Sequence, residues 1–578
     1  MSIFAGIVAR RAGLPLPPAV IAQLRTHLSR HPGDQERLRE VQSGPAYIAS
    51  LELGALGGSG AFEADGMHAF VAGAPLLQRA AGEVLERDAS LAQLAHDLAA
   101  GSDAGLRASR GTFCLVVADA AGRVHLATDK CGVRPLYCWV QPDFVIFATA
   151  QRILEALQGM PRELDLQGVA EAACFGFPLS DRTPYRDIVC LHAGEVLTVA
   201  GAEVQRKRYW RWDAVQPHPG GGEPAPQRLY RVFREAVRAR MAGDHAAAAF
   251  LSGGLDSRAI VAALRDEGVA VATSNYAPAE SQDQGLGAMA AERLGTSHTR
   301  LQMRPFAEGD PYSKASVLEW LATATTTAGP LPRPHVIWSG DGGSVGMGHV
   351  YLTEAMYAAL RAGKTGQALD IFRDVNRCYL SVRLMKPELG RQMQQLVEQG
   401  MRAELDALNP YDPARKMFLF LLLNDQRRHL FNHFEMLDTT RIEFELPFFD
   451  ADLLENVLAL PADPLLRHVF YMDWLACFGG GVLEVPWQAY PGHVPCPLPV
   501  PQGMSYQWDG ASAEQLRQRA RRGVDSLQKL LKAPGFAGNY LSLLASYALL
   551  LAMRLGRGRL SFHLHLPNIL HRYWARTQ

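Results

Sequence analysis

The residues best suited to chemistry lie in a glycine-rich stretch at positions 250–264, which reads FLSGGLDSRAIVAAL. The stretch combines the end of a predicted strand, a turn with the pattern SGGxDS at 252–257, and an apolar helix. The glycines lack a Cβ, so backbone amides can approach an anion, and the helix dipole favours negative charge there. The stretch therefore predicts a phosphate cradle, with the carboxylate of Asp256 at its edge.

This cradle differs from two common phosphate-binding loops, the Walker pattern GxxxxGK(S/T) and the dinucleotide-binding pattern GxGxxG. It resembles the pyrophosphate loop of the N-type ATP pyrophosphatases, which cleave ATP to AMP and pyrophosphate. The resemblance implies ATP and Mg²⁺ as ligands, with Asp256 holding the metal. The nucleotide-binding residues that it implies in this loop are Leu251, Ser252, Gly253, Gly254, Asp256 and Ser257. A plain strand-turn-helix built from small residues is the alternative interpretation.

A second glycine-rich stretch, VIWSGDGGSVGMGHVY, occupies positions 336–351. It resembles a loop of the class B asparagine synthetases, Ser-Gly-Asp-Gly-Gly-Asp-Glu-Leu-Phe-Gly-Gly-Tyr. The resemblance implies that Ser339 and Gly340 contact the nucleotide, and that Asp341 is a catalytic residue near the amine or the adenylated carboxyl group. Ser344 stands where the family has an aspartate that helps to hold magnesium. Since magnesium often keeps only one or two protein carboxylates, the metal can still be held without that residue.

A third stretch, RIEFELPFFD at 441–450, resembles the family's Glu-x-Arg-x-Pro-Phe-Leu-Asp. Relatives that form an amide within one substrate use a glutamate of this region, with a partner, as the base for the attacking amine. Glu443 is accordingly the predicted catalytic base, and a helix-capping or ion-paired glutamate is an equally weighted alternative. Glu445 takes the place of the family's arginine, which inverts the charge at that position.

Relatives also carry a lysine in a late loop, where it stabilises negative charge in the adenylation and acyl-transfer transition states. This chain has no lysine between Lys416 and Lys529, and Arg467 and His493 are weak substitutes. The missing lysine is the strongest argument from the sequence against ordinary catalysis.

Alternating strands and helices must position these residues. Strands are predicted at 246–251 and 269–274, the first followed by a helix to about residue 266 and the second by a helix at 283–294. This alternation indicates a parallel sheet, with ligands bound beyond the carboxyl ends of its strands. Ser274 ends the second strand, so it is expected near the adenine of ATP.

The first part of the chain, residues 3–209, alternates short β-rich runs with turns and helical stretches. Its block at 127–157 resembles the class B asparagine synthetases at Asp129, Gly132 and the Pro-Leu-Tyr run at 135–137. The resemblance implies an Ntn-hydrolase-like glutaminase domain, a four-layer sandwich of two β-sheets between helical layers.

The glutaminase of that family uses an N-terminal cysteine followed by Gly-Ile. A thiol is partly ionised at neutral pH, and the free α-amino group can act as its base. Gly6 and Ile7 match that dipeptide, but Ala5 stands in the place of the cysteine. Removal of Met1 would expose Ser2, which lies three residues before the required position and is a weak alternative nucleophile. Glutamine hydrolysis is therefore expected to be absent, with the domain surviving as a scaffold.

The composition limits the classes of partner and the cellular compartment that fit this chain. Lys plus Arg and Asp plus Glu each number 58, so no global charge points to nucleic acid. Eight scattered cysteines without a CxxC pair predict neither a zinc site nor a disulfide framework, and a reducing cytoplasm fits them. The apolar run at 541–553 is too short to span a membrane, so it predicts a packed helix or, as the weaker alternative, contact with a membrane surface. A partner protein or a homodimer stays open.

Together these features predict an α/β and α+β chain with two main domains. The expected parts are a glutaminase-like domain at 1–212, a linker at 213–227, an adenine-nucleotide α-hydrolase-like parallel-sheet domain at 228–500 and a helical extension at 501–578. The resemblance implies a ligase that adenylates a small-molecule or peptide carboxylate and transfers it to an amine without hydrolysing glutamine. Relatives of this kind are the lasso-peptide macrolactam cyclases and the β-lactam synthetases. Ammonia-dependent asparagine synthesis and a catalytically degenerate ATP-binding scaffold are the alternatives.

Overall fold

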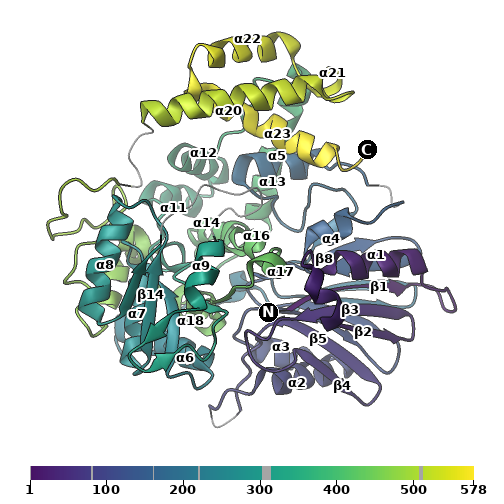
Figure 1. The fold of residues 1–578 in the computed structure, drawn as a ribbon, viewed down its shortest axis with the longest axis horizontal. Helices are drawn as coiled ribbons and strands as arrows, with labels where there is room; N and C mark the ends of the chain where they lie inside the picture. The colour runs from purple at the N-terminus through teal and green to yellow at the C-terminus, as the bar shows by residue number, and fades with distance from the viewer. Residues whose placement is uncertain (1, 80–81, 160–161, 219–221, 302–313, 507–511) are drawn as a thin grey trace. The chain divides into compact units, whose positions relative to one another are not determined.

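The computed structural model describes residues 2–79, 82–159, 162–218, 222–301, 314–506 and 512–578 (Figure 1). The chain forms two compact units, each built from several segments of the sequence. The first unit comprises Met1–Leu157, Leu191–Glu354 and Pro410–Gln507, and the second comprises Gln158–Cys190, Ala355–Asn409 and Trp508–Gln578. Both predicted domains with candidate chemistry contribute to the first unit, whereas most of the predicted helical extension belongs to the second.

The N-terminal part of the first unit is a sandwich of two antiparallel sheets. Its strands are β1 (Ser2–Ala9), β2 (Leu38–Ser43), β3 (Ala46–Glu52), β4 (Ala61–Ala64), β5 (Met67–Gly73), β6 (Phe113–Ala118), β7 (Val124–Thr128), β8 (Tyr137–Val140), β9 (Phe144–Ala148), β11 (Glu195–Ala200) and β12 (Glu203–Arg208). One sheet contains the order β8-β9-β1-β3-β2, and the other runs β12-β11-β7-β6-β5-β4. Helices α1 (Pro18–Leu28) and α4 (Gln151–Glu155) pack on the first sheet, and α2 (Arg87–Ala99), with α3 (Ala104–Ala108) beside it, packs on the second. These four layers confirm the predicted sandwich.

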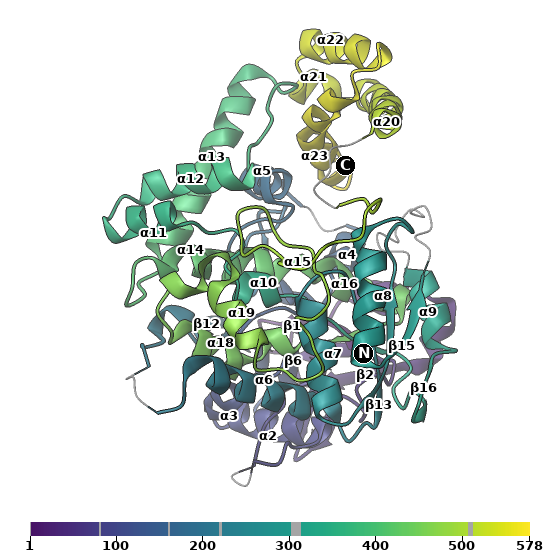
Figure 2. The ribbon, with the colours of Figure 1, turned by 90° about the vertical axis from the view of Figure 1, so that its left-hand side faces the viewer.

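The second part of the first unit is a five-stranded parallel sheet. Its strands are β13 (Ala246–Phe250), β14 (Ala270–Asn275), β15 (Ser297–Arg300), β18 (Val336–Trp338) and β19 (Glu443–Glu445), in the order β15-β14-β13-β18-β19. Helices α6 (Ala225–Met241), α7 (Asp256–Asp266) and α8 (Gln282–Leu294) accompany it (Figure 2). All neighbouring strands pair in parallel, which confirms the predicted sheet. Because β13 lies between β14 and β18, the strand order reverses there, which is where open α/β sheets bind ligands.

Short helices form much of the rest of the first unit. They are α9 (Lys314–Leu321), α10 (Gly343–Gly346), α14 (Arg415–Phe420), a π-helix (Leu421–Gln426), α15 (Arg427–His429), α16 (Phe431–Phe434), α17 (Leu437–Thr440), α18 (Ala451–Leu458) and α19 (Val469–Leu475). The π-helix stands out, because such segments are rare and are frequently found at functional sites.

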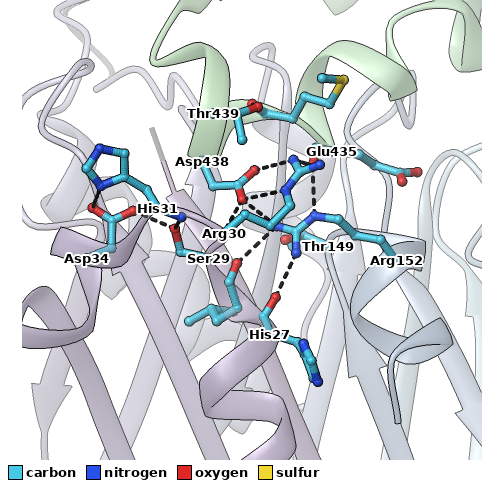
Figure 3. A network of polar contacts seen from close by, with 12 residues as sticks. His27, Ser29, Arg30, His31, Asp34, Thr149, Arg152, Glu435, Asp438 and Thr439 are labelled. Carbon is cyan, nitrogen blue, oxygen red and sulfur yellow. Dashed lines mark hydrogen bonds and ion pairs between the residues drawn. The ribbon is translucent and has the colours of Figure 1, made fainter. Parts of the chain in front are cut away.

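Buried polar contacts join the sandwich to these short helices within the first unit (Figure 3). Asp438, on α17, accepts hydrogen bonds from the backbone amide and Nε of Arg30 at 2.8 and 2.9 Å, and it pairs with Arg152 at 3.1 Å. Burial raises the pKa of Asp438, but the hydrogen bonds from Arg30 and the charge of Arg152 outweigh burial and hold this pKa below its usual value. The hydroxyl of Tyr137, on β8, donates to Glu435 at 2.6 Å.

The second unit consists mainly of helices. They include α5 (Leu166–Phe175), α12 (Thr365–Asn376), α13 (Pro387–Asp406), α20 (Ala513–Lys532), α21 (Phe536–Tyr540), α22 (Leu543–Arg554) and α23 (His565–Trp574), and α11 (Glu354–Arg361) leads into them. Helix α5 packs against α13 and α23, and α20 packs against α22 and the 3-10 helix Gly558–Leu564. Figure 2 shows α20 to α23 gathered together. In the described part of the chain, none of the helices combines the length and apolar character needed to cross a membrane.

Candidate active site

A cavity of about 720 Å³ lies beyond the carboxyl ends of the parallel strands, at the reversal of strand order. Both glycine-rich loops line it, the first after β13 and the second after β18. Its volume is in the range of small-molecule and cofactor sites, about 300 to 1,000 Å³. The predicted residues that line it are Leu251, Ser252, Asp256, Ser257, Ser274, Ser339, Gly340 and Asp341.

The other two predicted nucleotide-binding residues lie beside this cavity. Gly254 lines a smaller cavity of about 150 Å³, which shares Ser252 and Asp256 with the larger one. The backbone amide of Gly253 donates to the carboxylate of Asp283 at 3.3 Å. Burial raises the pKa of Asp283, and the hydrogen bond from Gly253 opposes that shift. The turn thus already binds a carboxylate through one of its amides, as expected of an anion cradle.

The two glycine-rich loops pack directly on each other, and the contact requires glycine. A Cβ on Gly340 would lie 2.6 Å from the backbone nitrogen of Ser257, and a Cβ on Gly343 would lie 2.6 Å from Cγ of Asp256. A side chain at either position would force the loops apart. Both patterns that the sequence analysis singled out therefore serve one site.

Asp256 begins α7 and faces the second loop. Its Oδ1 accepts hydrogen bonds from the Tyr471 hydroxyl at 2.6 Å and the Ser344 hydroxyl at 2.8 Å, and its Oδ2 accepts from the Ser344 backbone amide at 2.9 Å. Burial raises the pKa of Asp256, and these hydrogen bonds oppose the shift. Where the family pattern would set two carboxylates side by side, this chain has a donor and an acceptor.

Asp341 lies on the other side of the second loop and holds a histidine. Its Oδ1 is 2.9 Å from Nε2 of His429, and its Oδ2 accepts a hydrogen bond from the hydroxyl of Ser339. The His429 ring is about one third exposed, and it lines the cavity. The cavity thus contains an imidazole whose orientation is fixed by a carboxylate of the second loop.

The histidine comes from a segment that the sequence analysis did not single out. His429 ends α15, which directly follows the π-helix, and Asp425 and Gln426 of the π-helix also line the cavity. Burial raises the pKa of Asp425. The only signal in the sequence was an aspartate four residues before a histidine, a spacing that places both on one side of a helix.

Glu443, the predicted catalytic base, is not brought into the cavity. Its neighbours Ile442 and Phe444 line the cavity, and because side chains alternate along a strand, Glu443 points to the other face. There its Oε1 accepts from Arg134 of the sandwich at 2.7 Å and from the backbone amide of Phe444 at 2.9 Å. Both members of the ion pair are almost fully buried. The arrangement is the ion-paired glutamate that the sequence analysis left open.

The late part of the synthetase-like domain brings a tyrosine to both cavities. Tyr490 lines both cavities, and burial raises its pKa, so its hydroxyl stays protonated and can donate. The segment is fixed on the first loop, because the Gln488 amide donates to the Gly253 carbonyl at 3.0 Å and buried Arg258 donates to the Val485 carbonyl at 2.8 Å.

The two weak substitutes for the lysine do not reach the larger cavity. Arg467 pairs with Glu354 at 2.8 Å, and both side chains are exposed. His493 contacts His468 through their Nδ1 atoms at 3.1 Å. Neither residue is among those that line either cavity.

The described lining of the two cavities is acidic. It contains no lysine or arginine, whereas Asp256, Asp283, Asp341 and Asp425 all contribute to it. Among the described residues, no three His, Cys, Asp or Glu side chains gather closely enough to hold a metal by themselves. Magnesium that takes most of its ligands from phosphate and water needs only one or two carboxylates, and Asp256 and Asp283 fit that requirement.

The start of the sandwich holds no nucleophile at the position that the resemblance marks. Ala5 lies within β1, paired with Ala49 on β3 and Ala148 on β9, and is fully buried. Ser2 is also buried, and its hydroxyl contacts Glu52 and accepts a hydrogen bond from Arg87 at 2.6 Å.

Arg110, which precedes β6 of the sandwich, points to the synthetase-like part. Its Nε and a terminal guanidinium nitrogen each lie 2.9 Å from the carboxylate of Asp450. Asp450 also pairs with Arg240 at 2.7 Å and caps the N-terminus of α18. The position is thus part of a buried ion-pair network.

Two family models match the chain. The glutamine amidotransferase domain model matches residues 92–210, and the asparagine synthase model matches residues 228–315. Glutamine-hydrolyzing asparagine synthetase 3 of Bacillus subtilis (strain 168) is 26% identical over 189 residues, which is 32% of this chain and 30% of that protein. Putative glutamine-hydrolyzing asparagine synthetase 2 of Methanocaldococcus jannaschii is 25% identical over 148 residues, which is 25% of this chain and 29% of that protein. The chain thus matches about three tenths of the length of either relative.

Two solved structures cover more of the chain but are less similar. The glutamine phosphoribosylpyrophosphate amidotransferase from B. subtilis, complexed with ADP and GMP, covers 55% of this chain and 92% of its own, with 10% identity and a TM-score of 0.24. The structure of the allosteric regulatory enzyme of purine biosynthesis covers 52% and 75%, with 13% identity and a TM-score of 0.22. At such scores neither likeness supports an argument about function.

Proposed function

We propose that this asparagine synthetase-like protein is an ATP-dependent ligase that joins a carboxylate to an amine and releases AMP and pyrophosphate. The observation that carries the proposal is the direct packing of the two glycine-rich loops beside one cavity, at the reversal of strand order. A strand-turn-helix without function would need neither the glycines at the contact nor the cavity.

The proposed reaction has two steps. First, a carboxylate oxygen of the substrate attacks the α-phosphorus of ATP, and the bond from that phosphorus to the bridging oxygen breaks to release pyrophosphate. Next, the amine nitrogen attacks the acyl carbon, and AMP leaves with the electron pair of the carbon–oxygen bond. The amine gives up a proton, which a base at the cavity must accept. In the first step the turn at 252–257 holds the phosphates of ATP through its backbone amides.

We assign the base to His429. Histidine is the usual general base in enzymes, and this ring lines the cavity with one nitrogen fixed by Asp341 at 2.9 Å. That contact leaves Nδ1 as the nitrogen that can accept the proton of the amine. Glu443 is a poorer candidate, because its carboxylate is buried against Arg134 on the other face of β19.

The acidic lining makes divalent metal necessary for nucleotide binding. Bound Mg²⁺ would neutralise the negative charge of the phosphates at this site. Asp256 and Asp283 are the carboxylates that would hold the metal. Tyr490 would take part of the role of the family's lysine, because its protonated hydroxyl can donate to an oxygen on which negative charge develops.

The amine is proposed to come from the substrate itself or from free ammonia, and not from glutamine. Position 5 has neither a thiol nor a free α-amino group beside it. An intramolecular amine would make the product a lactam, including a macrolactam of a peptide. Ammonia-dependent asparagine synthesis and a non-catalytic ATP-binding scaffold are the competing candidates.

The first test follows oxygen atoms. Transfer of ¹⁸O from a labelled carboxylate to AMP, measured by mass spectrometry, is expected for any substrate that is adenylated. Aspartate with ammonium tests the asparagine alternative directly, and peptides with a free amine and a side-chain carboxylate test lactam formation. ATP binding without label transfer and without pyrophosphate release, across these substrates, would favour the scaffold.

A further inference from the structure

The C-terminal helices of the second unit carry a large excess of positive charge. Residues 512–578 contain eleven lysines and arginines but only two aspartates and glutamates, whereas the whole chain has 58 of each sign. Three of these arginines, Arg554, Arg557 and Arg559, are exposed at and just beyond the end of α22. This helical region therefore has a strong excess of positive charge.

The same region exposes a row of large apolar side chains. Leu544, Tyr547, Leu551 and Leu555 are exposed by 86, 58, 61 and 72%, and they recur every three or four residues along α22 and its end. Side chains at that spacing share one face of a helix. Phe562 of the following 3-10 helix is exposed by 58% as well.

This face is distinct from the face with which α22 packs in the second unit. Leu549, Leu550 and Met553 are buried, and α22 contacts α20. The internal packing of the helices is thus satisfied without the outer row. Burying the outer leucines would be favourable, since apolar surface gains free energy when it is removed from water.

We propose that the outer face of α22 docks on an anionic membrane surface. A helix that lies in the plane of a membrane inserts an apolar face below the lipid headgroups and places basic side chains among them. The exposed row and the arginines at its end match both requirements. A helix of twelve residues, about 18 Å long, is too short to span the hydrocarbon core, so the docking is peripheral.

Charge favours an anionic membrane over a second copy of the chain as the partner of this face. Two copies joined through this face would bring like charges together, which is unfavourable. An anionic bilayer supplies the opposite charge and, in addition, an apolar layer for the leucines. The proposal is independent of the chemistry assigned to the cavity.

The test measures binding of the full chain to lipid vesicles. The full chain is expected to co-sediment with phosphatidylcholine vesicles that contain phosphatidylserine and to bind far less to vesicles of phosphatidylcholine alone. Added salt is expected to release the chain, because salt screens the electrostatic attraction. The double variant Leu544→Glu/Leu551→Glu is expected to lower partitioning by at least about tenfold, because each leucine forfeits its burial. Arg557→Gln/Arg559→Gln should remove most of the preference for phosphatidylserine.

Val375→Glu is the matched control, since Val375 is an apolar residue of the second unit that is 51% exposed and lies on α12. It should bind like the unchanged chain. Circular dichroism and thermal melting verify that every variant is folded. If the folded chain binds neither kind of vesicle, the proposal is overturned. An equal loss of vesicle binding in the control variant would overturn it as well. Self-association that the double variant alone abolishes would reassign the face to a protein contact.

Discussion

The first unit contains two regions that resemble active centres of one family, and they differ in how much usable chemistry they present. Around the cavity, polar groups are present: Ser344 donates to Asp256, and Tyr490 lines the cavity. At the start of the sandwich, Ala5 offers no reactive group and is sealed within β1. In the first of these regions, a cavity of nucleotide size lies on the reactive atoms.

This difference directs attention to the ion pairs that hold the sandwich on the synthetase-like part. Two of its buried arginines are engaged with the synthetase-like part, Arg134 with Glu443 and Arg110 with Asp450. Removing one member of a buried pair leaves an uncompensated charge, which is strongly destabilising. The sandwich therefore supports the segment that forms one wall of the cavity, whether or not it hydrolyses glutamine.

The comparison is tested most severely at Asp256. Asp256→Ala removes a proposed metal ligand and the acceptor for Ser344 and Tyr471, so pyrophosphate formation should fall by at least about a thousandfold. A coupled pyrophosphate assay measures the loss. Asp525→Ala, at an exposed aspartate of the second unit, serves as the control and should be fully active. Turnover that survives in Asp256→Ala would show that the reactive region lies elsewhere.

His429 gives the next largest effect and separates the two steps. If it accepts the proton of the amine, His429→Ala should lower amide formation by about 10²- to 10⁴-fold and leave adenylation, measured as ATP–pyrophosphate exchange, nearly intact. Asp341→Asn should lower the rate of amide formation less, because Asp341 only orients the His429 ring. Equal loss of exchange and amide formation would instead assign His429 to nucleotide binding.

The features of the cavity that the sequence predicts are local ones. Gly340 and Gly343 occur where any Cβ would collide with the first loop, and alternating strands and helices with turn residues dictate the parallel sheet. Such constraints act within a few residues, so a pattern can reveal them. The position of Ser274 at a strand end followed from the same logic.

The remaining features depend on contacts between distant parts of the chain. His429 meets Asp341 across 88 positions and Arg134 meets Glu443 across 309, and nothing near either residue signals its partner. The resemblance implied that Glu443 is the catalytic base. Because side chains alternate along β19, the Glu443 side chain instead faces the sandwich. A π-helix is equally hard to foresee, because it differs from an α-helix only in backbone hydrogen bonding.

The ion pair between the two parts predicts an effect on stability. Arg134→Met should lower the free energy of unfolding by about 3–5 kcal/mol, because Glu443 then stays buried with only the Phe444 amide as a donor. Denaturant unfolding measures the change. Arg79→Met, which breaks an exposed ion pair with Glu83, should cost about 0–1 kcal/mol. Folded Glu443→Gln should retain adenylation and amide formation, whereas a large loss of amide formation alone would restore Glu443 as the base.

The smallest effect is expected from restoring a thiol to the sandwich. Ala5→Cys places sulfur in the middle of β1, where the residue has an ordinary peptide nitrogen and no α-amino group to take the thiol's proton. The site is fully buried between β3 and β9, so the thiol would also lack access to glutamine. Glutamate release from glutamine, followed with glutamate dehydrogenase, should stay at background, with a modest loss of stability from the added sulfur. Glutamine hydrolysis by this variant would contradict the contrast between the two regions, because a single atom would then separate the sealed region from a working one.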